Sequence, residues 1–144
     1  MEQERCTLFT FMTGNTFAAV LHIICGLSAW CCPVFPLFSA LLFLLERNVK
    51  ARIACIHTAL VSIAVSLLAL VPFVIWLIIR ALAHASGLFY SLCTVMFAAT
   101  LLLLAFVLLV VEVTCGIKSF RDEPVSVPLI TPLTAKIAGR IISE

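Results

Sequence analysis

Charged residues are scarce in this chain of 144 residues, at 11% of the total. Soluble domains carry about 25% charged residues, because their surfaces have to be covered with polar groups. Hydrophobic residues make up 64% of the chain. This composition excludes an ordinary soluble domain and predicts an integral membrane protein. The net charge of +2 is also too small to indicate a nucleic-acid-binding surface.

The chain also lacks the features of a cleavable signal peptide. Such a peptide opens with basic residues and ends its apolar core at a small-residue cleavage site. Here Glu2 and Glu4 stand beside Arg5, and the apolar run from Phe17 extends beyond signal-peptide length. We therefore expect the N-terminal segment to be retained. There is also no twin-Arg signal and no prenylation box.

The seven cysteines are odd in number, and most lie inside apolar runs. This pattern does not fit a secreted disulfide framework, and we interpret most of them as packing residues. Cys31 and Cys32 are adjacent, whereas membrane thiol oxidoreductases usually separate their two cysteines by two residues. A membrane thiol or haem redox protein is kept as an alternative.

Three long uncharged runs predict three transmembrane helices, since a bilayer core needs about 20 apolar residues per helix. We place these helices at 17–45, 53–79 and 85–111. The fold class is all-α, a membrane helical bundle forming one domain over 1–144. An N-terminal segment, 1–16, precedes the helices, and a cytoplasmic tail, 112–144, follows them.

The first run is interrupted by Pro33 and Pro36. Proline removes a backbone donor and kinks or breaks a helix. The run is either one long kinked helix or a re-entrant hairpin whose arms enter and leave on the same side. Each arm would have about 13–16 residues, which is short for a full crossing, and we favour the single kinked helix.

Basic residues predict the orientation, because cytoplasmic loops carry an excess of lysine and arginine. The turn 46–52 and the tail hold seven of the nine basic residues, leaving Arg5 and Arg80. We expect the turn and the tail to be cytoplasmic in a bacterial inner membrane. The N-terminus is then outside for three crossings and inside if the first run is a hairpin.

The tail combines a proline-rich segment with a short apolar pattern. Prolines make 121–132 irregular. Leu133, Ile137 and Ile141 recur at spacing four and predict a short amphipathic helix over 133–143 that lies in the membrane interface.

Polar residues inside membrane spans are costly and favour a functional hypothesis. His22 lies in the first run, His57 near the start of the second and His84 near the external connection. Histidine can ligate a cofactor or relay protons, but three crossings would put His22 and His57 near opposite faces. Glu112, just after the third run, is either an interfacial carboxylate or an ion or proton site. We predict no catalytic residue, no metal and no cofactor.

Small residues recur along the second run. Ala54, Thr58, Ser62 and Ser66 stand at spacing four, which lets helix backbones approach closely. This face suits internal packing and a partner helix equally well.

Several segments together resemble the Tic-twenty-like family, which includes the chloroplast inner-envelope import component and small bacterial relatives. The similar segments lie within about residues 20–142. Two of them belong to the first half of the chain: 22–26, which is followed by Pro33 and Pro36, and 46–50, which is followed by Arg52 and His57. The other two, 116–121 and 125–130, follow the third apolar run. The chain departs from the family with Leu44-Leu45 for a usual Trp, Thr58 for Gln and Asp122 for Gly. The positions singled out are His22, Pro33, Pro36, Arg52, His57, Glu112, Lys118, Arg121 and Pro128.

The resemblance implies a small bundle of three or four membrane helices, and the chloroplast member is thought to help form a protein-conducting path. We expect a non-enzymatic accessory or structural subunit that acts through other membrane proteins, with protein translocation as one setting. The alternative is an oligomeric small channel or transporter, since three crossings enclose no pore alone. The expected partners are the lipid bilayer and a membrane protein or a second copy of the chain.

Overall fold

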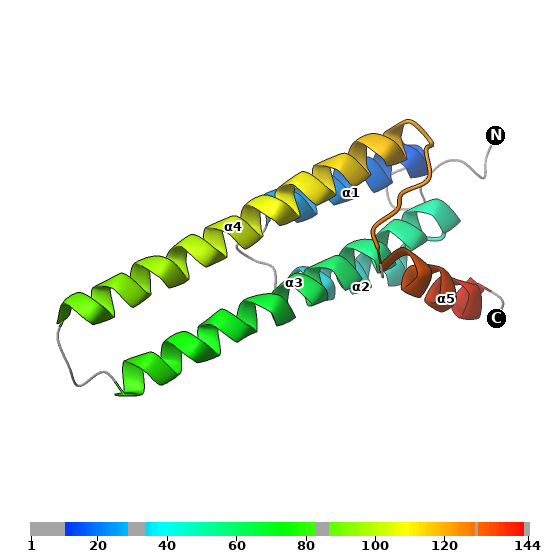
Figure 1. Ribbon diagram of the computed structural model, residues 1–144. Helices are drawn as coiled ribbons and strands as arrows, with labels where there is room; N and C mark the ends of the chain where they lie inside the picture. Colours follow the sequence, from blue (N-terminus) through cyan, green and yellow to red (C-terminus); the bar gives the residue numbers. More distant parts are fainter. Residues whose placement is uncertain (1–10, 29–33, 83–86, 129, 143–144) are drawn as a thin grey trace.

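The structure, a computed structural model, describes residues 11–28, 34–82, 87–128 and 130–142. All regular elements of these residues are helices, which confirms the all-α prediction. In chain order they are α1 (Gly14–Leu27), α2 (Phe35–Leu45), α3 (Val49–Leu82), α4 (Gly87–Phe120) and α5 (Ile130–Ile142). α1 and α3 begin, and α2 and α4 finish, at the same end of the bundle, which we call the tail end (Figure 1). The opposite end is called the turn end.

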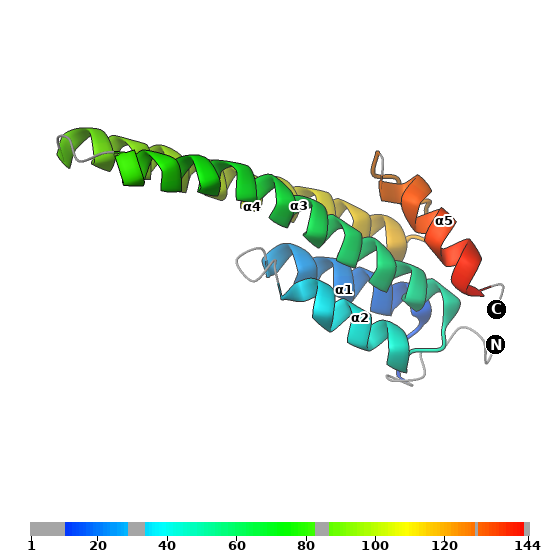
Figure 2. The same cartoon turned by 90° about the horizontal axis from the view of Figure 1, so that it is seen from below.

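The first apolar run forms two helices, α1 and α2, and not the single kinked helix that the sequence analysis favoured. α1 runs inward from the tail end, and α2 returns to it (Figures 1 and 2). The hydroxyl of Thr13 caps α1 by accepting a hydrogen bond from the Thr16 backbone N–H. Pro36 lies in the first turn of α2, where a missing N–H costs nothing. The first run therefore forms two helices of opposite direction, as in the hairpin alternative.

Two helices, α3 and α4, are long and apolar enough to cross a membrane. Each has 34 residues and measures about 50 Å at 1.5 Å per residue. α3 begins four residues earlier than predicted, because Asn48 caps it by accepting from the Ala51 N–H. The buried Glu46 carboxylate accepts from the backbone N–H groups of Arg47 and Asn48 in the turn before it.

α4 continues to Phe120, nine residues beyond the predicted end of the third helix at residue 111. Nothing in 112–120 breaks a helix, and the apolar and small residues there pack against α1. Glu112 consequently lies two turns inside α4 and not at its end.

α1 and α2 cover the tail-end half of the bundle (Figure 2). α1 packs against α3 and α4, and α2 packs against α3. Their buried side chains form one apolar cluster with α3, made of Phe17, Ala18, Leu21, Cys25, Phe35, Ala51, Ala54 and Cys55. In the turn-end half, the described residues are those of α3 and α4, which lie side by side (Figure 2). Trp76 there stacks on Phe97 and donates a hydrogen bond to the Thr94 hydroxyl.

α5 lies on the opposite face of α3 from α1 and α2 (Figure 2). It begins three residues before the predicted start, and Pro132 is tolerated within its first turn. Thr134 and Ala138 are buried, and Ile130 packs on Val61 and Leu108. Leu133, the first of the apolar residues at spacing four, is exposed. It therefore lies on the face of α5 that points away from α3.

The end of α4 is closed by a left-handed residue, Asp122, with φ 58°. Its N–H donates to the Ser119 carbonyl, and the Glu123 N–H donates to the Lys118 carbonyl. This is the Schellman pattern, in which glycine is usual at the left-handed position. Lys50 donates to the Asp122 carboxylate at 2.8 Å. The hydrogen bond and the charge of Lys50 lower the pKa of Asp122, so this exposed pair is present above the ordinary aspartate pKa and is lost as the pH falls through the lowered value.

We expect Asp122→Gly to be more stable than Asp122→Ala by about 1 kcal/mol, because only alanine is strained at a positive φ. Both variants lack the carboxylate, so the loss of the Lys50 pair cancels between them. Unfolding of the two purified variants in the same detergent measures the difference. Equal stabilities would mean that Asp122 does not hold this conformation in solution.

Candidate functional site

Three ionisable side chains from three helices meet inside the tail-end half. His22 comes from α1, His57 from α3 and Glu112 from α4, and their exposed fractions are 1%, 5% and 0%. His22 Nδ1 and Glu112 Oε2 are 2.5 Å apart in a buried hydrogen bond. The two imidazole rings meet edge to face, with centroids 5.3 Å apart. We call this set the His–His–Glu cluster.

Glycines let α1 and α4 approach closely enough to bury the cluster. A Cβ on Gly26 of α1 would lie 3.1 Å from the Cβ of Glu112. A Cβ on Gly116 of α4 would lie 3.1 Å from the carbonyl oxygen of Ala19 and 3.4 Å from the Cβ of His22. The backbones of α1 and α4 therefore approach closely on both sides of the His22–Glu112 hydrogen bond.

The small residues of α3 line the other side of the cluster and pack internally. Ser62 is hydrogen-bonded to Cys25 of α1, with the two side-chain atoms 3.3 Å apart. Thr58 of α3 is hydrogen-bonded to Ser39 of α2, with 3.2 Å between the two hydroxyl oxygens. Of the two uses left open for this face, the structure has internal packing, because α1 and α2 turn back onto it.

Not every polar atom of the cluster is satisfied. Both ring nitrogens of His57 and Oε1 of Glu112 are buried and have no hydrogen-bond partner among the described residues. A buried polar atom without a partner costs about 1–3 kcal/mol and calls for an explanation. The cluster can therefore accept a further proton or a bound cation.

One expectation about these residues is wrong. Three crossings would put His22 and His57 near opposite faces, but α1 starts at the tail end, and the two imidazole rings lie 5.3 Å apart. Glu112 lies within α4 and has no exposure to solvent. His57 lies five residues after Arg52, and Glu112 lies six residues before Lys118. These similar spacings from a basic residue were the only indication in the sequence that His57 and Glu112 lie at the same level of the bundle.

The other predicted positions are scattered. Pro33, His84, Cys31 and Cys32 lie outside the described residues. Pro36 is half-buried in the first turn of α2.

Arg52 is half-buried at the tail end, with its guanidinium carbon 4.3 Å from the centroid of Phe43. Lys118 is half-buried in the last turn of α4, and Arg121 and Pro128 are exposed beyond it. Of the members of this set that lie among the described residues, the structure brings His22, His57 and Glu112 together in one site.

Comparisons with known proteins add no relative: no family model, no curated protein and no solved structure matches the chain.

Proposed function

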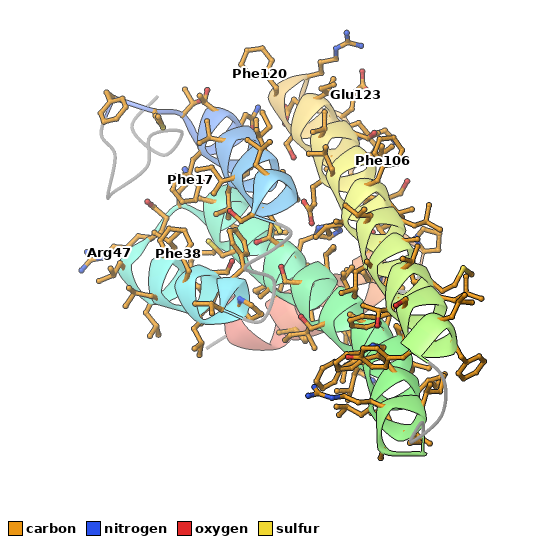
Figure 3. The ribbon with its side chains drawn as sticks, turned by 90° about the vertical axis from the view of Figure 1, so that its left-hand side faces the viewer. Phe17, Phe38, Arg47, Phe106, Phe120 and Glu123 are labelled. Carbon is orange, nitrogen blue, oxygen red and sulfur yellow. The ribbon has the colours of Figure 1, made fainter. Side chains whose placement is uncertain are left out.

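We propose that the chain is an integral membrane protein in which α3 and α4 cross the bilayer and the α1–α2 hairpin enters one leaflet from the tail end. The observation that supports this most directly is the exposed apolar surface of α3 and α4. Figure 3 shows Phe106 on the outer side of α4, 62% exposed, whereas Phe17 points among the helices and is 5% exposed. Lipid chains cover such a surface without cost.

The two ends of the bundle suit the two surfaces of a bilayer. Trp76 and Tyr90 lie near the turn end with Arg80 over the Trp76 ring, as in the aromatic belts of membrane proteins. Among the described residues, the remaining lysines and arginines belong to the 46–52 turn, the end of α4 and the segments after it. The positive-inside rule favours a cytoplasmic tail end, with the bacterial inner membrane as the setting.

We infer a non-enzymatic role exercised through other membrane proteins. Two crossings with a half-depth hairpin enclose no path across the membrane, so any transmembrane activity needs further subunits. The turn-end half of α3 and α4 offers such a subunit a surface, because α1, α2 and α5 cover only the tail-end half. The resemblance to the Tic-twenty-like family makes a protein-translocation assembly the first one to examine.

A photocrosslinking amino acid at Val95 or Met96, which lie in the turn-end half of α4 and are 63% and 62% exposed, tests this role in the native membrane. We expect alkaline-resistant membrane association and a reproducible adduct with one other membrane protein. Leu108, 1% exposed on the same helix, is the matched control and should give only internal crosslinks. Solubilisation by alkali would contradict membrane insertion. Adducts with lipid alone would contradict the subunit role.

The His–His–Glu cluster favours a second candidate, an oligomeric channel or transporter. Ionisable groups within a membrane commonly mark ion or proton paths. Crosslinks only between copies of the chain would support this candidate, and proton or metal flux into proteoliposomes would then be the next measurement.

A further inference from the structure

We propose that His22, His57 and Glu112 bind a divalent transition-metal ion of the Zn²⁺ class. One ligand atom from each of the three side chains can be chosen so that all lie within 4.8 Å of one another. Ligand atoms around one tetrahedral Zn²⁺ are about 3–3.5 Å apart, given bonds of about 2.0–2.2 Å. Closing the site around one ion would therefore bring these atoms closer by about 1–2 Å at most.

The unpartnered atoms are those that such an ion would use. Each ring nitrogen of His57 and Oε1 of Glu112 lacks a hydrogen-bond partner among the described residues, and both side chains are more than nine-tenths buried. An imidazole nitrogen and a carboxylate oxygen each offer a lone pair to a cation. A bound dication also balances the carboxylate charge where water does not reach it.

The ligand types select the class of ion. Two imidazoles and one carboxylate suit Zn²⁺, Fe²⁺, Co²⁺ and Cu²⁺, whereas Ca²⁺ and Mg²⁺ prefer sites built from oxygen. Three protein ligands leave one tetrahedral position for water or an exchanging ligand, as in sites that are not purely structural. The Cys25–Ser62 and Ser39–Thr58 hydrogen bonds join α1 and α2 to α3 and help to hold together the helices that carry His22 and His57.

The inference does not depend on a partner protein. It requires only that α1, α3 and α4 fold as described, so it stands whether the chain is a subunit or a transporter. It competes with one simpler use of the same atoms, in which the cluster exchanges only protons.

Titration of the purified, chelator-treated full chain with Zn²⁺ tests the proposal. We expect one ion per chain, and binding at least about 100-fold weaker in His57→Gln, because loss of mere outer-shell partners already costs 10–100-fold. Asp122→Asn removes an exposed carboxylate and should bind like the wild type. No stoichiometric binding, or equal affinity in the wild type and His57→Gln, would overturn the proposal and leave the proton-only use.

A second measurement needs no variant and so does not depend on a variant's folding. Cu²⁺ bound to the wild-type chain should show electron-spin-echo modulation from two imidazole nitrogens. A signal from one imidazole, or from none, would contradict a site that contains both His22 and His57.

Discussion

Replacing His22 with leucine is expected to destabilise the bundle by about 3–5 kcal/mol, because the Glu112 carboxylate is then buried without its partner. His22 supplies its hydrogen bond at 2.5 Å, and the carboxylate has no exposure to solvent. Glu112→Leu removes a hydrogen-bond partner from the His22 imidazole without leaving a buried charge. We therefore expect a smaller loss of stability, about 1–3 kcal/mol.

The double replacement His22→Leu/Glu112→Leu should recover much of this loss, since no unpaired polar group then remains between α1 and α4. Unfolding in mixed micelles, with chelator present so that metal binding does not contribute, gives the three free energies. A coupling energy near zero in this double-mutant cycle would show that the two side chains do not interact in the folded protein.

Adding a side chain at Gly116 is the second large effect we expect. The new Cβ would lie 3.1 Å from a backbone carbonyl oxygen of α1, and backbone atoms cannot rotate away as a side chain can. Gly116→Ala should therefore cost about 1–3 kcal/mol and Gly116→Val more, by overpacking the α1–α4 contact.

Gly139→Ala provides the matched control, because a Cβ there meets nothing within 4 Å. The same change in α5 should stabilise the protein by up to about 1 kcal/mol through helix propensity alone. Thermal unfolding of both variants in one detergent compares them. If Gly116→Ala were as stable as Gly139→Ala, α1 would not pack against α4 at the distance described.

Length and composition were enough to determine the helical class and the two long helices. Runs such as 53–79 and 85–111 contain no charge and no helix-breaking cluster, so their local sequence settles their structure. Pro72 does not alter this, because α3 continues through it. The boundaries were less accurate, since caps such as Asn48 and Asp122 depend on side-chain contacts that a hydrophobic run does not reveal.

The site was decided by tertiary structure, and in particular by the direction of α2. Pro33 and Pro36 indicated an interruption, but a kink and a reversal have the same local sequence. Reversal brings α1 back beside α4, and only then do His22 and Glu112, 90 residues apart in the chain, form a pair. Because packing and not local propensity selects between these arrangements, the sequence by itself determined the apolar helices and the ionisable residues, and only the tertiary structure brought His22, His57 and Glu112 together.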